Sequence, residues 1–319
     1  MSSRGAGLPV SESGSHSSVR YVQVDAERDG QRLDNFLISL LDGVPRSLVY
    51  RLVRTGQVRI NGSRAKPMKK LRSGDEIRVP PVKEARPEKA RLPAGLVDEI
   101  RSRIVYRSDD FVVLDKPAGL AMHGGSGLSY GLMSVLAEID TSWRPVHRLD
   151  RPTSGLVLIA CRHQALVKLQ RLFTEHRLSK RYLALLEGEI PAGETRVDVP
   201  LKKIRDKSGQ HRVIAADDGQ AARSVFRLLE RIGAYSYVEV EIETGRTHQI
   251  RVHASHLGHA VAGDELYNPA PAPKGLKRLF LHSHYLAFDW PDERIFSAPL
   301  PQELGQLLND LREQAPHPR

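Results

Sequence analysis

Cysteine and aromatic residues are scarce in this chain of 319 residues, which has one cysteine and 6% aromatic side chains. A single thiol, Cys161, excludes an intrachain disulfide and a cysteine-rich zinc site. The apolar run 156–161 that contains it is far too short to span a membrane. Residues 1–19 lack the apolar block of a secretory signal and are rich in serine and glycine. We therefore expect a cytoplasmic protein with no membrane segment and a disordered leader over residues 1–19.

Motifs for bound cofactors and for several catalytic types are also missing. His123-Gly124-Gly125-Ser126-Gly127 is not followed by the Gly-Lys-Ser/Thr of a phosphate-binding loop, and no Gly-x-Gly-x-x-Gly opens a helix after the apolar strand predicted from Phe111. Ser154 lacks the Gly-x-Ser-x-Gly turn of a hydrolase nucleophile. The histidines at positions 253, 256 and 259 are not part of a His-Glu-x-x-His zinc pattern. We expect neither a metal nor a cofactor.

Charge is unevenly distributed along the chain. The whole sequence has 48 basic and 38 acidic residues, a formal net charge of +10, which points to a polyanionic partner. Residues 20–82 have 13 basic and 7 acidic side chains, so about a fifth of the chain carries more than half of the excess. A phosphate-facing surface and an ordinary solvated face would both have this composition. The candidates for phosphate contacts are Arg46, Arg51, Arg54, Lys69 and Lys70.

Residues 20–82 also contain an ordered series of motifs. Arg32-Leu33-Asp34 opens a helix with one apolar face, and Pro45-Arg46-Ser47 forms a turn before a second helix. Gly56-Gln57-Val58-Arg59-Ile60-Asn61-Gly62 predicts a strand and a turn, and Gly74-Asp75 precedes a closing strand. This series resembles the S4 RNA-binding domain. The resemblance implies a small α+β domain that binds structured RNA by its shape and phosphates.

Residues 101–319 are expected to form a second domain. Residues 83–100 combine mixed charge with proline and glycine breakers, and we interpret them as a linker. Beyond the linker, many strand-like segments follow one another with few helices between them. This pattern favours an α+β fold with a largely antiparallel mixed sheet flanked by helices.

One carboxylate in this domain has an unusual setting. Asp150 lies between Arg148 and Arg151, directly before the small-residue loop and the wholly apolar strand 156–160. Aspartate is depleted in sheets and is costly to bury without a partner. Asp150 is therefore the candidate chemical centre, although a structural ion pair would explain the same pattern.

Two residues far from Asp150 in the sequence are candidate partners. Arg246 lies in a distant turn, and a guanidinium against Asp150 would keep the carboxylate ionised and fix its oxygens. Tyr182 lies on a predicted strand beside two cations, although an ordinary strand tyrosine would look the same. A glycosidase needs two paired carboxylates, and neither Asp115 nor Glu243 has a setting like that of Asp150.

Four motifs in order resemble the RluA-type pseudouridine synthases. His147-Arg148-Leu149-Asp150-Arg151-Pro152-Thr153-Ser154-Gly155 resembles the signature of that family, and Lys180-Arg181-Tyr182 its tyrosine motif. Thr244-Gly245-Arg246-Thr247-His248-Gln249-Ile250-Arg251 resembles the arginine motif, and Arg278-Leu279-Phe280-Leu281-His282 the last core strand. The resemblance covers roughly residues 104–300, and a preceding S4 domain is usual in many members.

The resemblance implies an isomerase that converts uridine in RNA to pseudouridine by base flipping, with Asp150 as the essential carboxylate. Tyr182 would stack on the uracil and is a candidate base for the C5 proton. Arg246 would pair with Asp150. Arg148 would fill the space that the flipped base leaves, and Leu281 would form part of the pocket wall. We also expect Arg151, Thr153 and His123 to contact the RNA.

The loop 123–131 refines this expectation. It is similar to the RluC-type enzymes that modify 23S ribosomal RNA of the large subunit, whereas the RluD type usually has proline where Gly124 stands. We expect a monomer that acts on this RNA. The alternatives are an RluD-type enzyme with other target uridines, an enzyme that releases the free base, and a non-catalytic S4-type RNA-binding or ribosome-assembly protein.

Overall fold

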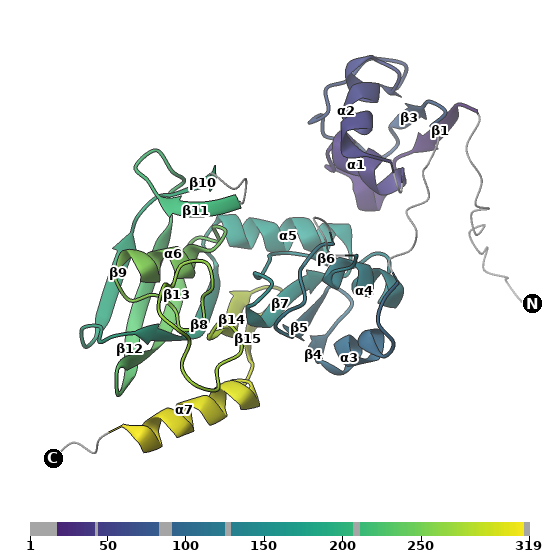
Figure 1. The fold of residues 1–319 in the computed structure, drawn as a ribbon. Helices are drawn as coiled ribbons and strands as arrows, with labels where there is room; N and C mark the ends of the chain where they lie inside the picture. Colours follow the sequence, from purple (N-terminus) through teal and green to yellow (C-terminus); the bar gives the residue numbers. More distant parts are fainter. Residues whose placement is uncertain (1–17, 42–43, 83–90, 125–128, 207–210, 316–319) are drawn as a thin grey trace, which may run out of the picture. The chain divides into compact units, whose positions relative to one another are not determined.

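The computed structural model describes residues 18–41, 44–82, 91–124, 129–206 and 211–315 (Figure 1). The chain divides into two compact units, Met1–Ala90 and Arg91–Arg319. In the described ranges no helix is long and apolar enough to cross a membrane. The same ranges hold no group of three or more histidine, cysteine or acidic side chains that could bind a metal. Most of the predicted leader lies outside the described residues.

The first unit packs two helices on a small sheet. Its strands are antiparallel and lie in the order β1-β3-β2. Apolar side chains from one face of each helix are buried against the sheet, as the helical spacing predicts. The elements are β1 (Arg20–Gln23), a 3-10 helix (Ala26–Arg28), α1 (Leu33–Leu40), α2 (Arg46–Arg54), β2 (Arg59–Ile60) and β3 (Glu76–Val79).

The Arg32-Leu33-Asp34 motif has a structural explanation in this unit. The Asp34 side chain is only 1% exposed and accepts hydrogen bonds from the Arg32 guanidinium at 3.0 and 2.5 Å and from the Tyr50 hydroxyl at 2.8 Å. These bonds compensate the cost of burying a carboxylate. They also tie the start of α1 to α2, and they keep the pKa of Asp34 below its usual value against the effect of burial.

A ten-stranded mixed sheet forms the centre of the second unit. Its main order is β4-β5-β7-β14-β8-β13-β12-β9, with β15 beside β14 and β6 beside β7. Every pairing is antiparallel except that of β7 with β14. The strands are β4 (Ile104–Arg107), β5 (Phe111–Lys116), β6 (Arg144–Pro145), β7 (Ser154–Ala160), β8 (Leu178–Glu187), β9 (Glu194–Asp198), β12 (Arg223–Ile232), β13 (Tyr235–Ile242), β14 (Leu281–Asp289) and β15 (Glu293–Ser297).

Helices and a separate two-stranded ribbon surround this sheet (Figure 1). Helices α3 and α4 contact each other, α5 packs on β7, and α6 contacts both β12 and the ribbon. These elements are α3 (Leu96–Ser102), α4 (Leu132–Ile139), α5 (His163–Thr174), α6 (Gln249–His256), α7 (Gln302–Gln314), and the ribbon strands β10 (Leu201–Arg205) and β11 (His211–Ala215). The predicted α+β class with a largely antiparallel mixed sheet is confirmed.

The parallel pairing of β7 with β14 depends on Gly155. This glycine has φ +109°, and a Cβ atom there would lie 2.2 Å from the backbone oxygen of Ser283. Only glycine permits both the backbone conformation and the close approach. The Thr-Ser-Gly that follows Asp150 therefore lets the central strand begin directly behind the carboxylate.

The boundary between the units differs from the predicted one. We expected a linker over residues 83–100, but the second unit begins at Arg91, and α3 occupies part of that range. Ile100 is fully buried in the main core of the second unit. The segment was interpreted as a linker because of its breakers and mixed charge, but its few apolar residues are spaced to pack one face of a short helix.

Candidate active site

A cavity of about 220 Å³ lies where the predicted motifs meet. The loop before β7 forms one side, β8 and the start of β14 form the floor, and the turn between β13 and α6 forms the other side. Its lining residues are Val146, His147, Arg148, Leu149, Asp150, Thr153, Phe173, Lys180, Tyr182, Ile242, Gly245, Arg246, Thr247, His248, Gln249, Ile250, Arg251 and Leu281. The structure thus brings together residues that are more than a hundred positions apart in the sequence.

Asp150 is partly buried beside two basic side chains. Its carboxylate is 15% exposed, and its Oδ2 atom lies 3.6 Å from Nη1 of Arg251 and 3.9 Å from Nε2 of His248. The backbone nitrogen of Thr153 donates to the Asp150 carbonyl oxygen at 3.1 Å, which fixes the turn that leads into β7. Burial lowers the pKa of His248, although Asp150 opposes this effect. Arg251 is therefore the permanent cation beside the carboxylate.

Arg251 is itself held by a second carboxylate. Its Nε and Nη2 atoms donate to the two oxygens of Asp264 at 2.7 and 2.6 Å. Burial alone would lower the pKa of Arg251, but the bonds to Asp264 and the charge of Asp150 raise it above its usual value. Asp264 also accepts from the backbone nitrogens of Leu266 and Tyr267. The guanidinium thus stays charged and fixed in position toward Asp150.

Arg246 does not form the ion pair that we predicted with Asp150. It lines the same cavity, but its Nε atom donates to the carbonyl oxygen of Ala221 at 3.0 Å. It also borders a neighbouring hollow of about 350 Å³, which Lys202 and Lys203 line too. The arginine motif contains two guanidiniums, and α6 places the second one, Arg251, next to the carboxylate. Both arginines are in the sequence motif, but the motif does not indicate which one lies beside Asp150. Asp264, which holds Arg251 in position, lies outside the motif.

Tyr182 and Leu281 lie on adjacent strands at the bottom of the cavity. Both are almost fully buried, at 5% and 3% exposed. Burial raises the pKa of the Tyr182 hydroxyl, the charge of Asp150 adds to the rise, and a hydrogen bond with Ser283 opposes it. The side chain is therefore a neutral phenol at neutral pH and offers an aromatic face to a ligand.

The far end of the cavity holds residues that the sequence interpretation left without a role. His147 stacks on Phe173 with ring centroids 6.4 Å apart, and its Nε2 atom accepts from the backbone nitrogen of Leu158. Burial lowers the pKa of His147 to about 3, so the ring is neutral. The Nζ atom of Lys180 lies 3.7 Å from the centroid of the Phe173 ring. Burial lowers the pKa of Lys180 to about 7.

The remaining predicted contact residues occupy different positions. Arg148 is exposed and lines the cavity, whereas Thr153 is 2% exposed and its Oγ1 atom has no hydrogen-bond partner among the described atoms. Arg151 is exposed outside the cavity lining and donates from Nε to the carbonyl oxygen of Gly119. His123 is also exposed and is not part of the lining. The rest of its glycine-rich loop, residues 125–128, lies outside the described residues.

Lys116 supports the loop of Asp150 from behind, and no sequence motif had assigned it a role. It is fully buried, and its Nζ atom donates to the carbonyl oxygens of Pro117 at 2.8 Å, Leu120 at 2.9 Å and Arg151 at 3.5 Å. Burial lowers its pKa to about 7, although the nearby charge of Asp150 raises it. In the sequence, Lys116 is distinguished by its position at the end of the apolar strand β5.

Comparison with known proteins agrees with this geometry. The family model for RNA pseudouridylate synthase matches residues 110–256, and that for the S4 domain matches residues 31–77. A protein of Salmonella typhi, ribosomal large subunit pseudouridine synthase C, is 41% identical over 93% of this chain and 98% of its own length. The chain belongs to the RNA pseudouridylate synthase family. A protein of the same name from Escherichia coli K12 is 40% identical over 92% of this chain and 97% of its own.

Solved pseudouridylate synthases have the same fold. Human RNA pseudouridylate synthase domain containing 1 aligns with a TM-score of 0.55 and 28% identity over 72% of this chain and all of its own. Human RNA pseudouridylate synthase domain containing 4 aligns with a TM-score of 0.58 over 68% of this chain and 95% of its own, at 23% identity. The predicted family and its S4 domain are confirmed, and this synthase is an isomerase of uridine in RNA.

Proposed function

We propose that this protein converts specific uridines of large-subunit ribosomal RNA, 23S in bacteria, to pseudouridine. Relatives of about 40% identity whose names include the large ribosomal subunit cover more than nine tenths of the chain, S4 domain included. This coverage of both units is the observation that carries the proposal, because substrate choice in such enzymes depends on the whole RNA-binding surface.

The reaction moves one bond within the nucleotide. The N1–C1′ bond breaks with its electron pair on the uracil, the base turns, and C5 bonds to C1′. C5 then loses its proton and N1 gains one, so nothing is oxidised and no group leaves. We assign the carboxylate at the reacting sugar and base to Asp150, since among the described carboxylates it alone combines partial burial, a fixed guanidinium and a place in the cavity.

The other cavity residues receive roles according to their positions. Tyr182 stacks on the uracil, and because its raised pKa keeps the hydroxyl protonated at neutral pH, it does not serve as the base for the C5 proton. Leu281 forms the apolar wall beside it. Arg148, exposed at the rim, fills the gap that the flipped base leaves in the RNA. Arg246 orders the RNA at the border of the two hollows.

The first unit supplies affinity for structured RNA. Five basic side chains are exposed there and form no ion pair with another described residue: Arg46, Arg51, Arg54, Lys69 and Lys70. Exposed cations without a described ion-pair partner are suited to phosphate contacts. The chain contributes Asp150, Tyr182 and Arg251 to the cavity. We propose that it acts as a monomer in the cytoplasm.

The decisive experiment maps pseudouridine at single-nucleotide level in 23S ribosomal RNA from a strain that lacks this gene. The strain is complemented with the wild-type protein, with Asp150→Asn, or with Glu239→Gln as a carboxylate control outside the cavity. We expect the missing sites to return with the wild type and the control but not with Asp150→Asn. A full set of sites in the strain without the gene would reject the proposed substrate.

A further inference from the structure

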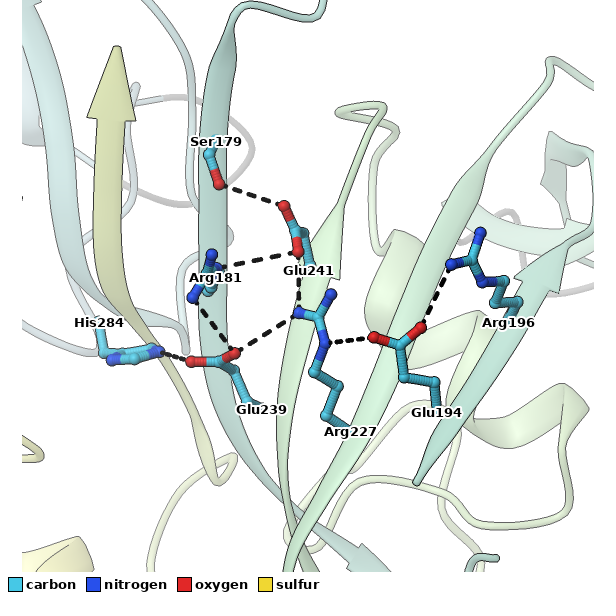
Figure 2. A network of polar contacts seen from close by, with 8 residues as sticks. All are labelled: Ser179, Arg181, Glu194, Arg196, Arg227, Glu239, Glu241 and His284. Carbon is cyan, nitrogen blue, oxygen red and sulfur yellow. Dashed lines mark hydrogen bonds and ion pairs between the residues drawn. The ribbon is translucent and has the colours of Figure 1, made fainter. Parts of the chain in front are cut away.

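Two adjacent cations on β8 have opposite surroundings. Arg181 points away from the cavity, within 3.7 Å of a Glu239 oxygen and 3.8 Å of a Glu241 oxygen (Figure 2). Lys180 points into the cavity and is 3% exposed. Among the described residues, no carboxylate lies within 4 Å of the Lys180 nitrogen and no acceptor takes a hydrogen bond from it; its ring contact is with Phe173. Buried amines are normally hydrogen-bonded. The Lys180 nitrogen is therefore a buried donor that lacks an acceptor among the described residues.

The strand geometry places Lys180 at a defined end of the cavity. Tyr182 is the next inward-pointing residue of β8, about 6.6 Å further along the strand. Tyr182 pairs with Ser283 of β14, which itself pairs with Gly155 near the start of β7, whereas Lys180 pairs with Leu286 further along β14. Asp150 precedes the start of β7, so Lys180 is the more distant of the two. The order along the cavity is therefore Asp150, Tyr182, Lys180.

Gly245 keeps the Lys180 end of the cavity open. A Cβ atom on Gly245 would lie 2.6 Å from Cζ of Phe173 and 3.8 Å from Nζ of Lys180. A larger residue would therefore collide with the aromatic ring that Lys180 contacts and would occupy the space beside the amine. The absence of a side chain leaves the Lys180 nitrogen facing the cavity.

We propose that Lys180 donates a hydrogen bond to the uracil carbonyl oxygen that points away from Asp150. If the reacting N1–C1′ bond lies at Asp150 and the ring lies on Tyr182, the atom across the ring from N1 is C4, so O4 points toward Lys180. When the base turns to bring C5 to C1′, the atom across from C5 is C2, and O2 takes the place of O4. The same amine thus meets a carbonyl oxygen before and after the turn.

This contact would act in both base discrimination and rate. Cytosine has an amino group at C4, which cannot accept a hydrogen bond from Lys180. When the N1–C1′ bond breaks, the electron pair on the uracil is shared by its carbonyl oxygens, and a buried donor stabilises that charge. Lys180 keeps its protons throughout, because the C5 proton and the N1 proton balance each other. The inference rests on the proposed function.

The first test uses Lys180→Met, which keeps the length of the side chain, and Arg181→Met as a matched control. Single-turnover conversion is measured on an RNA fragment that contains a mapped target uridine, together with the Kd for that RNA. We expect Lys180→Met to lower the rate about 100-fold with a nearly unchanged Kd, and Arg181→Met to keep both. A wild-type rate in Lys180→Met overturns the inference while leaving the proposed function intact.

The second test changes the substrate, so that its first arm needs only the wild-type protein. The target uridine is replaced with 4-thiouridine or 2-thiouridine, whose sulfur is a weaker acceptor than oxygen. We expect the thio substitutions to slow the wild-type protein and to have little further effect on Lys180→Met. Equal slowing in both proteins, or none in the wild type, overturns the contact. If the wild type converts no uridine in the unmodified fragment, the proposed function fails and the inference falls with it.

Discussion

The two faces of the central sheet use charge in different ways. On the outer face, arginines and glutamates alternate across β8, β13, β12 and β9, and each described cation meets a carboxylate (Figure 2). Arg227 bridges Glu194 and Glu241 at 2.8 Å each. These side chains are partly exposed, and such pairs contribute little stability individually. They lie beside the part of this face that packs against α7, and they favour the register of the strands.

The cavity face has fewer charges, and they are buried and unevenly paired. Arg251 serves both Asp264 and Asp150, and Lys180 meets no carboxylate among the described residues. Burying such groups costs free energy that only a partner recovers. The difference indicates that charges on the outer face neutralise one another within the folded chain. Charges on the cavity face are instead available to bind a ligand.

The largest expected effect comes from exchanging one carboxylate on each face. Asp150→Asn should lower the single-turnover rate at least about a thousandfold, because the amide can neither attack nor balance Arg251. Glu239→Gln, on the outer face, should leave the rate within about twofold. Both are measured on the same RNA fragment. Comparable losses in the two variants would remove the distinction between the faces.

The next largest difference between the two faces is expected in the free energy of unfolding. Arg251→Met leaves the fully buried Asp264 without its cation, and we expect the free energy of unfolding to fall by about 3–5 kcal/mol. Arg227→Met on the outer face should cost about 1 kcal/mol or less. Urea unfolding of both variants checks this. The double variant Arg251→Met/Asp264→Leu should recover part of the loss, and a loss as large for Arg227→Met would contradict the comparison.

The pH dependence of stability should report the buried lysines. Burial lowers the pKa of Lys116 and Lys180 to about 7, so between pH 7.5 and 9 the unfolded chain binds more protons than the folded one. Stability should therefore rise with pH in this window, by up to about 1.4 kcal/mol per pH unit for each lysine. Lys180→Met should flatten the rise and Arg181→Met should not. An unchanged slope in Lys180→Met would show that its amine is not desolvated.

The smallest effect concerns cations outside the cavity altogether. Arg51→Ala removes an exposed side chain of the first unit that has no described ion pair, so the slope of log Kd against log salt should fall by about 1. Arg196→Ala removes an exposed arginine that already contacts Glu194 at 3.3 Å, and the slope should not change. RNA-binding titrations over a range of salt concentrations measure both. A larger change for Arg196→Ala would place RNA on the outer face of the sheet.

Much of the site could be predicted because its chemistry lies in short motifs. The signature around Asp150 combines a carboxylate, a tight glycine-dependent turn and a buried strand, and each of these is local. The alternation of β8 places Tyr182 inward without any tertiary information. The predicted pairing with Arg246 differs from the structure because two guanidiniums five positions apart fit the same motif, and only the placement of α6 against the loop distinguishes them.

Local sequence patterns are enough to predict the family, the α+β class and Asp150 as the candidate catalytic carboxylate, because these depend on residue types at fixed local spacing. Tertiary structure decided which side chains surround that carboxylate. Asp264 fixes Arg251, and Phe173 with Gly245 frames Lys180, through contacts between different elements of the fold. Such contacts depend on how strands and helices pack in three dimensions, which short-range patterns do not specify. The opposite environments of Lys180 and Arg181, adjacent in the chain, follow from the same packing.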